Sequence, residues 1–301
     1  MPELRTHTQR QPTRKRLLLS WSGGKDSAWA LHLLRQNPQY EVVALLTTIN
    51  EKFRRVAIHG FREELLDLQA QSAGLPLWKV DLPFPCSNAD YESRMATVCA
   101  RAVAEDLHGI AFGDLFLEDI RAYRIAMLAR TGLEPIFPVW TPDLGISTAA
   151  LARQMIAAGL RAHLTCIDPR ALNSSFAGRT FDAGLLADLP AEVDPCGERG
   201  EFHTFAFAGP MFSRTVSVIP AQTIERDNYI YAELLPTPVS EPPNDAAPSK
   251  DSRTSPGAAA VGSGLPSACG NLHNLGPDAG QTGMGRLRTE CRPMVEARRF
   301  L

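Results

Sequence analysis

A short run of glycine, serine and charged residues near the start of the sequence has the residue types that bind the phosphates of a nucleotide. Apolar residues 17–19 precede the run, which reads Ser22-Gly23-Gly24-Lys25-Asp26-Ser27. A strand that ends in a glycine turn before a helix directs backbone N–H groups and the positive end of the helix dipole at an anion. Ser22 and Ser27 add hydroxyl donors, and Lys25 adds a positive charge. Asp26 repels a bare phosphate, so we expect it to bind Mg²⁺ or to hold the loop.

The spacing of this phosphate run distinguishes it from other phosphate-binding loops. Neither the Walker A spacing G-x-x-x-x-G-K-S/T nor the dinucleotide spacing G-x-G-x-x-G occurs there. The run instead resembles the S-G-G-x-D-S signature of the PP-loop ATP pyrophosphatases, which cleave ATP between the α- and β-phosphates. An ordinary strand-to-helix turn with a serine cap is the alternative, and the position after the first predicted strand favours the phosphate site.

A second group of charged residues follows a predicted strand at residues 109–113. Ligands of open α/β sheets bind outside the carboxyl ends of the strands, so Asp114 lies where chemistry is expected. Glu118 and Arg121 are three residues apart and share a face of the next predicted helix. From this spacing alone they either form a surface ion pair or face a ligand.

The third group is a run of glycines and carboxylates, called the late loop here, Asp194-Pro195-Cys196-Gly197-Glu198-Arg199-Gly200-Glu201-Phe202-His203-Thr204. A tight loop of this kind presents Glu198 and Glu201 to an amine, an ammonium ion or a metal. We expect Cys196 to be a small buried residue rather than a nucleophile. We expect His203, on a presumed strand, to be a structural donor, with an acid–base role as the alternative.

Short apolar runs alternate with amphipathic stretches, which predicts an α/β fold with a mostly parallel, doubly wound sheet. The predicted strands cover residues 16–21, 41–48, 77–81, 109–113 and 162–166. The predicted helices cover residues 27–35, 60–73, 89–107, 118–130 and 148–158. Later apolar runs and a Gly209-Pro210 turn predict an antiparallel hairpin and strand in a smaller lobe, at residues 202–207, 215–219 and 229–235.

The composition divides the chain into four parts. We expect a disordered basic leader, an ATP-binding domain, a smaller substrate-binding lobe and a disordered tail rich in Pro, Gly, Ser and Ala, at residues 1–15, 16–170, 171–235 and 236–301. The formal net charge of −2 predicts no nucleic-acid partner and no membrane surface. The six cysteines include no C-x-x-C pair, so no zinc ribbon or thioredoxin-like motif is indicated, and they do not form a disulfide framework typical of small secreted chains, which fits a reducing cytoplasm.

Together the three groups resemble the diphthine–ammonia ligase family, which carries S-G-G-K-D-S, then G-D-x-x-x-E-D-x-R, then G-E-x-G-E-F/Y. The resemblance covers residues 16–235, with the motifs in this order. It implies a PP-loop fold and an adenylation reaction. In that reaction a carboxylate attacks the α-phosphate of Mg–ATP, pyrophosphate leaves, and ammonia displaces AMP to give an amide. Arg199 departs from the family loop, where Gly or Asn is usual, and its charge could select an acidic or phosphorylated substrate.

The resemblance also implies roles for individual residues. The ATP-binding residues are Ser22, Gly23, Gly24, Lys25, Asp26 and Ser27, with Asp26 as the metal ligand. The catalytic residues are Lys25, Asp26, Asp114, Glu198 and Glu201. The substrate-binding residues are Glu118, Arg121, Gly197, Gly200 and His203. The expected cofactors are ATP and Mg²⁺, and the expected partners are ammonium and a carboxylate that is either a small molecule or carried by a protein.

Four functions stay open on this evidence. The first is a carboxylate–ammonia ligase of the diphthine type, and the second is the same chemistry on another small carboxylate, for example in cobalamin-related metabolism. The third is a tRNA-modifying PP-loop enzyme, although the absence of C-x-x-C pairs counts against it. The fourth is a nucleotide sensor, which would bind ATP without releasing AMP. The chain is too short for an additional glutaminase domain, so we expect free ammonium as the nitrogen source.

Overall fold

The computed structural model describes residues 13–56 and 59–237. The strands are β1 (Lys15–Ser20), β2 (Tyr40–Asn50), β3 (Arg55–Val56), β4 (Leu77–Leu82), β5 (Gly109–Ala111), β6 (Glu134–Ile136), β7 (Arg161–Ile167), β8 (Phe202–Ala208), β9 (Val218–Arg226) and β10 (Tyr229–Pro236). The helices are α1 (Lys25–Gln36), α2 (Glu63–Ala73), α3 (Asn88–Ala104), α4 (Glu118–Leu128), α5 (Thr141–Leu144), α6 (Thr148–Ala157), η1 (Ser174–Phe176) and α7 (Ala183–Asp188). The expected leader and tail lie outside the described residues, apart from residues 13–15 and 236–237.

The first sheet is mostly parallel, as predicted. Its strands run in the order β3-β2-β1-β5-β6, and β4 pairs with the second half of β2. Every pair is parallel except that of β2 with the two-residue strand β3. Because β1 and β5 are parallel neighbours, the residues that follow them meet at one edge of the sheet. A Cβ on Gly113, just after β5, would lie 3.0 Å from the Ser27 backbone nitrogen.

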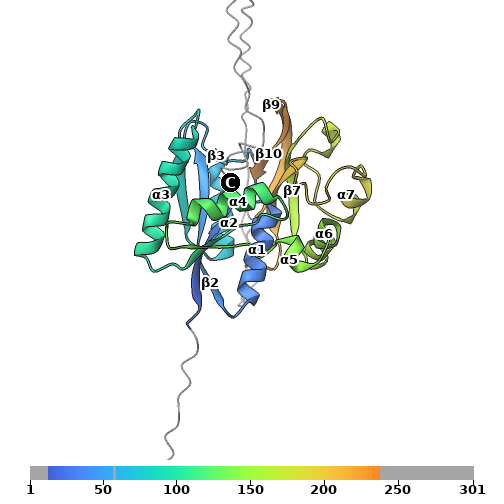
Figure 1. Cartoon of the computed structure of the whole chain (residues 1–301). Coiled ribbons are helices and arrows are strands. Elements are labelled where there is room, and N and C mark those ends of the chain that lie inside the picture. Colours follow the sequence, from blue (N-terminus) through green and yellow to red (C-terminus); the bar gives the residue numbers. More distant parts are fainter. Residues whose placement is uncertain (1–12, 57–58, 238–301) are drawn as a thin grey trace, which may run out of the picture. The chain divides into compact units, whose positions relative to one another are not determined.

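Helices cover both faces of the first sheet. Leu17 and Leu19 of β1 pack into the core formed with α1 and α2, whereas Leu18 packs on the opposite face. That face is covered by an apolar stripe on α3, formed by Tyr91, Met95, Val98, Cys99 and Ala102. Figure 1 shows α3 and α1 on opposite sides of the strands. The sheet is therefore doubly wound, which confirms the predicted fold class.

The second sheet is antiparallel, with the strand order β8-β7-β10-β9. It contains the strand expected at residues 162–166, so our assignment of that strand to the parallel sheet is wrong: β7 pairs antiparallel with both β8 and β10. The physical reason is that β7 is buried along almost its whole length, and an apolar run of this kind fits either sheet. The hairpin also differs from our prediction, because β9 and β10 form it and the positive-φ pair Asp227-Asn228 closes it.

The helices expected from the sequence all form, with shifted ends. The largest shifts are three residues: α2 begins at Glu63 rather than residue 60, and α3 ends at Ala104 rather than residue 107. The short elements β3, β6, α5 and α7 were not predicted, because runs this short carry no periodic pattern. Among the described residues, no helix is both long and apolar enough to cross a membrane.

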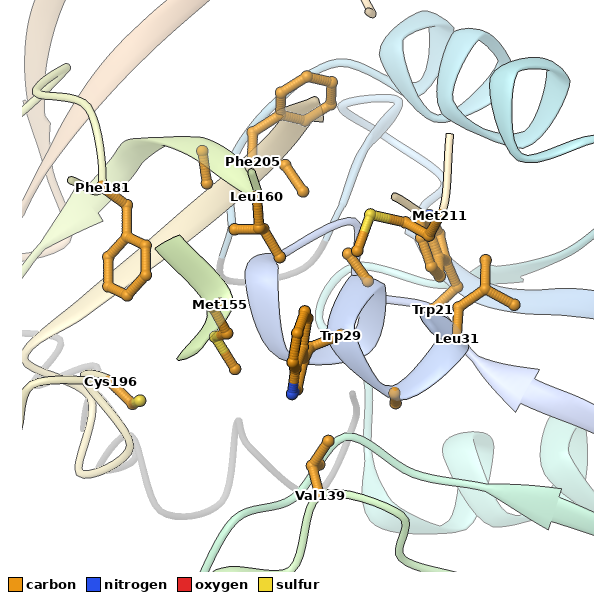
Figure 2. Packing of buried hydrophobic residues seen from close by; sticks show 14 of the residues in the cluster. Trp21, Trp29, Leu31, Val139, Met155, Leu160, Phe181, Cys196, Phe205 and Met211 are labelled. Atoms are coloured by element: carbon orange, nitrogen blue, oxygen red, sulfur yellow. The ribbon is translucent and has the colours of Figure 1, made fainter. Parts of the chain in front are cut away.

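Helix α1 packs in the core that joins the two sheets. Its residues Trp29 and Leu31 share one hydrophobic cluster with Met155 and Leu160, which come from α6 and the turn after it, and with Phe205 of β8 (Figure 2). Full burial of such a side chain contributes about 1.5–3 kcal/mol. Because the phosphate run leads into α1, the same core fixes the position of the helix N-terminus.

Candidate active site

A cleft opens at the carboxyl edge of the first sheet, where the phosphate run meets the late loop. Its empty volume, including the open mouth, is about 730 Å³. It is lined by Ser20, Ser22, Lys25, Asp26, Ser27, His59, Phe112, Gly113, Asp114, Leu117, Ile120, Arg124, Cys196, Gly197, Glu198, Phe202, His203 and Thr204. The three groups of residues selected from the sequence therefore all reach one cleft.

The two glycines of the phosphate run allow a tight turn into α1. Gly23 has a φ of +75°, and a Cβ there would lie 2.6 Å from Cζ of Phe61 and 2.7 Å from Oε1 of Gln69. A Cβ on Gly24 would lie 2.8 Å from Cε1 of His59. Gln69 Nε2 also donates to the Gly23 carbonyl at 2.9 Å. The packing around the turn therefore leaves no room for a side chain at Gly23.

The phosphate run is also bonded to β8, at the edge of the second sheet. The Ala206 N–H donates to the Gly23 carbonyl at 2.9 Å. The Lys25 N–H donates to the Thr204 hydroxyl oxygen at 3.0 Å. Gln69 reinforces this junction by donating to the Ala206 carbonyl at 2.6 Å. The run is therefore held by both sheets.

Two serine hydroxyls border the cleft at the start of α1. The Ser22 and Ser27 oxygens are 3.3 Å apart, and the Ser27 hydroxyl donates to the Gly24 carbonyl at 3.0 Å. The Gly24 N–H donates to Ser22 Oγ at 3.3 Å. Gly24 is the N-cap of α1 and has no side chain to cap the helix. This end of α1 is therefore suited to an anion.

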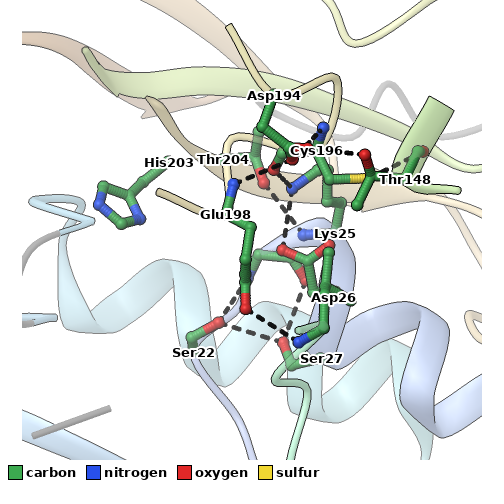
Figure 3. A network of polar contacts seen from close by, with 12 residues as sticks. Ser22, Lys25, Asp26, Ser27, Thr148, Asp194, Cys196, Glu198, His203 and Thr204 are labelled. Carbon is green, nitrogen blue, oxygen red and sulfur yellow. Dashed lines mark hydrogen bonds and ion pairs between the residues drawn. The ribbon is translucent and has the colours of Figure 1, made fainter. Parts of the chain in front are cut away.

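Lys25 connects the phosphate run to the late loop. Only 2% of its side chain is exposed, and its ammonium group donates to Asp26 at 2.8 Å and to the Cys196 carbonyl. Burial opposes the charge of Lys25, but acidic neighbours, Asp26 first among them, raise its pKa above the ordinary value. Figure 3 shows Lys25 and Asp26 between the two serines on one side and the late loop on the other. The positive charge of Lys25 is thus kept inside the cleft.

Asp194 organises the late loop through its carboxylate. One oxygen accepts from the N–H groups of Cys196 at 2.9 Å and Glu198 at 3.2 Å, and the other accepts from the Thr148 hydroxyl at 2.6 Å (Figure 3). Gly197 has a φ of +67°, and a Cβ there would lie 2.7 Å from a backbone oxygen of β8. Asp194 was not predicted to have a role. An aspartate three residues before a glycine is the turn signal that could have identified it.

Glu198 is the acidic residue of the late loop that lines the cleft. Its Oε1 accepts from the Leu115 N–H at 2.9 Å. Burial, and then the charges of Asp26 and Asp114, raise the pKa of Glu198 to about 8, although the Leu115 hydrogen bond and Lys25 oppose the shift. A carboxyl group that titrates near neutral pH can gain and lose a proton during a reaction.

Glu201 and Gly200 do not line the cleft, and the catalytic role expected of Glu201 and the substrate contact expected of Gly200 stay predictions. Glu201 is 8% exposed, and its Oε1 accepts from the Asp194 N–H at 3.0 Å. This carboxylate supports the late loop because it is turned toward the backbone of that loop. Gly200 has a φ of +96° and completes the turn that leads into β8.

Asp114 lines the cleft as expected, together with a buried arginine from α4. Nε of Arg124 is 3.5 Å from Oδ2 of Asp114, and the guanidinium group donates to the Tyr91 hydroxyl at 3.4 Å. Arg124 is 2% exposed. Arg124 was not among the predicted site residues. The available signal was its place on the apolar stripe of the predicted helix, four residues from both Ile120 and Leu128.

Glu118 and Arg121 lie on α4 outside the cleft lining, and the substrate contacts expected of them stay predictions. Glu118 is exposed, whereas Arg121 pairs with Asp143 at 3.5 Å and lies 4.7 Å from the centre of the Trp140 ring. The physical reason is that a different face of α4, carrying Ile120 and Arg124, turns toward the cleft.

Two histidines form another part of the lining. His203 was expected there, and His59 was not. Their rings are 4.9 Å apart, and Nδ1 of His59 lies 2.9 Å from the Thr204 carbonyl oxygen. A single histidine without a spacing pattern has no sequence signal for a site, which is why His59 was missed.

One carboxylate oxygen of Asp26 fits a divalent cation. Oδ1 is buried and has no hydrogen-bond partner among the residues that the structure describes, whereas Oδ2 pairs with Lys25. Mg²⁺ commonly binds through one or two carboxylates together with the phosphates of a substrate. Within the described part of the chain, no group of three or more His, Cys, Asp or Glu residues could hold a metal ion. The unpartnered oxygen of Asp26 therefore suits a cation that binds together with a nucleotide.

The parallel sheet, the glycine turn after its first strand and the adjoining cleft define a PP-loop nucleotide-binding fold. Sequence profiles identify the family: that of the diphthamide synthase N-terminal domain matches residues 15–134, and that of the diphthamide synthase C-terminal domain matches residues 147–232. The chain belongs to the diphthamide synthase family. This confirms the family predicted from the three sequence motifs.

Curated relatives agree with this family. The chain is 26% identical to the diphthine–ammonia ligase of Danio rerio over 243 residues, which cover 71% of this chain and 90% of the relative. It is 22% identical to the diphthine–ammonia ligase of Homo sapiens over 225 residues, which cover 67% of this chain and 82% of the relative. A solved structure, the U34-tRNA thiolase NcsA from Methanococcus maripaludis, aligns with 42% of this chain and 53% of its own at 15% identity and a TM-score of 0.28.

Proposed function

We propose that this chain is an ATP-dependent ligase that adenylates a carboxylate and joins it to ammonia, with release of AMP and pyrophosphate. The observation that carries the proposal is the meeting of the phosphate run and Glu198 in one cleft. The family of the chain and the names of its curated relatives support the same reaction. They do not favour a tRNA-modifying enzyme or a nucleotide sensor.

The phosphate run binds ATP in this proposal. The first turn of α1 and the hydroxyls of Ser22 and Ser27 donate to phosphate oxygens, and Lys25 supplies a positive charge. Asp26 holds Mg²⁺ through its unpartnered oxygen. The bound cation would neutralise negative charge on the phosphates. The glycines keep side chains out of the space that the phosphates need.

The reaction has two steps. In the first, a carboxylate oxygen bonds to the α-phosphorus of ATP while the bond to the β-phosphate oxygen breaks and pyrophosphate leaves. Lys25 and the N-terminus of α1 stabilise the charge on the departing pyrophosphate. In the second, ammonia bonds to the acyl carbon, the bond from that carbon to the AMP oxygen breaks, and the nitrogen loses a proton. The ionised form of Glu198 accepts that proton.

The substrate in this proposal is diphthine, a modified histidine carried by a protein, and the nitrogen comes from free ammonium. Arg199 is exposed beside Glu198, with its guanidinium group 5.6 Å from the centre of the Phe116 ring. It therefore suits an acidic group near the reacting carboxylate. We assign ATP binding to the part before β7 and substrate binding to β7–β10 with their loops. This assignment moves the expected boundary from residue 170 to a point between β6 and β7.

The test combines the purified protein with Mg–ATP, ammonium chloride and a diphthine-bearing elongation factor. We expect AMP and pyrophosphate in equal amounts, together with the mass change from acid to amide. The Ser27→Ala variant should form AMP about tenfold more slowly, because one donor to the phosphates is lost. Ser93→Ala, on the exposed face of α3, is the matched control and should behave like the parent protein. Binding of ATP without any AMP would instead identify a sensor.

A further inference from the structure

His59 is held tightly in the wall of the cleft, although the proposed reaction gives it no role. Its side chain is 5% exposed and lines the cleft. On one side it lies against the phosphate run, since a Cβ on Gly24 would be 2.8 Å from its Cε1. On the other side the His203 ring is 4.9 Å away. The ring therefore sits where the phosphate run and β8 meet.

The hydrogen bond of His59 determines which ring nitrogen carries a proton. Nδ1 lies 2.9 Å from the Thr204 carbonyl oxygen, which can only accept, so the proton is on Nδ1. In a neutral ring this leaves Nε2 as an acceptor. Burial lowers the pKa of His59 to about 4; the Thr204 hydrogen bond opposes this shift, and Lys25 adds to it. The ring is therefore uncharged near neutral pH.

We propose that Nε2 of His59 accepts a hydrogen bond from the nitrogen substrate, which binds as ammonium or as the nucleophile ammonia, and holds it beside the phosphate run. This inference rests on the proposed function, because the nucleophile belongs to the amide-forming step. A phosphate oxygen does not suit a bare Nε2, since both atoms are acceptors. A ligand with N–H donors does suit it.

The charges around His59 favour the same ligand. The lining holds two ion pairs, Lys25 with Asp26 and Arg124 with Asp114, whose charges offset each other. Glu198 in the late loop adds a negative charge once it ionises, at a pH of about 8, and that charge attracts a cation. The His59 ring is neutral and does not repel ammonium. His203 on β8 is the remaining titratable side chain beside the His59 ring.

Nitrogen NMR tests the proposal without an acceptor substrate. The protein carries ¹⁵N-labelled histidine and is saturated with magnesium and an ATP analogue that cannot react. The His59 signals are assigned by their loss in His59→Asn or His59→Gln, among the seven histidines of the chain. We expect Nδ1 to carry the proton and Nε2 to be bare, with an Nε2 resonance that moves on addition of ammonium chloride. Tetramethylammonium chloride, which has the same charge and no N–H donor, should leave it in place.

Two outcomes of the NMR experiment overturn the proposal. One is a proton on Nε2. The other is an Nε2 resonance that ammonium does not move, or that both salts move equally. Nucleotide binding is measured in the same samples. Failure of the parent protein to bind nucleotide would contradict the proposed function, whereas bound nucleotide with an unmoved Nε2 resonance contradicts only the role of His59.

A pair of substitutions separates ligand binding from a structural role. His59→Asn keeps a donor near the Nδ1 position and lacks Nε2, whereas His59→Gln brings an amide oxygen near the Nε2 position. We expect His59→Asn to raise KM for ammonium about tenfold, because one hydrogen bond to the nucleophile is lost. KM for ATP should change by less than about twofold. His59→Gln should recover part of this loss. If His59 served only to bond the Thr204 carbonyl oxygen, the order of the two variants would be reversed, and His59→Asn would resemble the parent protein.

Discussion

The phosphate run and the late loop face the same cleft but are held in place by different means. In the phosphate run the glycines matter because they lack side chains: Gly23 turns with a positive φ in a space that Phe61 and Gln69 fill. In the late loop one carboxylate, that of Asp194, accepts three hydrogen bonds and so sets the path of the backbone. The phosphate run is therefore sensitive to added atoms, and the late loop is sensitive to the loss of a hydrogen-bond acceptor.

The largest effect should come from adding one methyl group to the phosphate run. In Gly23→Ala the new Cβ would meet Phe61 and Gln69 at under 3 Å in a backbone conformation that alanine disfavours. We expect a loss of about 3 kcal/mol in the free energy of unfolding and loss of ATP binding, measured by urea denaturation and calorimetry. Gly132→Ala is the matched control, because Gly132 also has a positive φ, +83°, but nothing within 4 Å of the added Cβ. Equal losses in the two variants would contradict the packing explanation.

A smaller effect should follow removal of the acceptor in the late loop. Asp194→Ala breaks the hydrogen bonds to Thr148, Cys196 and Glu198, and we expect a loss of about 2 kcal/mol in stability. The rate of AMP formation should fall more than the affinity for ATP, because the phosphate run keeps its own contacts. Asp182→Ala is the control, since Asp182 only caps α7, through one bond to the Leu185 N–H, and should cost about 1 kcal/mol without loss of activity. If the affinity for ATP fell as much as the rate of AMP formation, the phosphate run and the late loop would not act separately.

A third effect is a change in how stability depends on pH. The folded protein keeps the Glu198 carboxyl protonated up to a pH of about 8, whereas in the unfolded chain it ionises at its ordinary value of 4.5. The unfolded state therefore binds fewer protons between these values, so this group makes the protein less stable as the pH rises through that window. Glu198→Gln removes the titration. The stability of the variant relative to that of the parent protein should therefore increase from about pH 5 to about pH 9. Denaturant unfolding of both proteins at the two pH values measures this change.

The activity of the same variant separates two roles of Glu198. Glutamine can still accept from the Leu115 N–H but cannot take a proton from the nucleophile. Amide formation should therefore fall while ATP binding persists. A variant with unchanged amide formation would show that Glu198 only shapes the late loop.

The sequence was sufficient for those parts of the fold that repeat with a regular period. The helices and the long strands of the first sheet have apolar residues at helical or strand spacing, so they were predicted within a few residues. The sheet to which β7 belongs could not be predicted in this way. Burial on both faces makes its sequence compatible with a parallel or an antiparallel sheet, and its partners β8 and β10 lie later in the chain.

The residues of the cleft also divide into those that the sequence predicted and those that it did not. Ser22, Lys25 and Asp114 were found because motifs and strand ends mark them. Arg124 and His59 were missed, because each reaches the cleft only through the packing of the element that carries it. Glu118 was selected for its charge and spacing, yet the orientation of α4 turns it to the outside. The sequence indicates which side chains can react, whereas helix rotation decides which of them meet.

The bonds between the phosphate run and β8 have a consequence for solubility. β8 is an outer strand of its sheet, and its apolar sequence includes Phe202, Phe205 and Phe207. An outer strand with unpaired backbone groups is a template for self-association. The phosphate run covers part of that edge by accepting from the Ala206 N–H. Nucleotide binding and protection from aggregation therefore depend on the same few residues. A substitution that unfolds the phosphate run would abolish both at once.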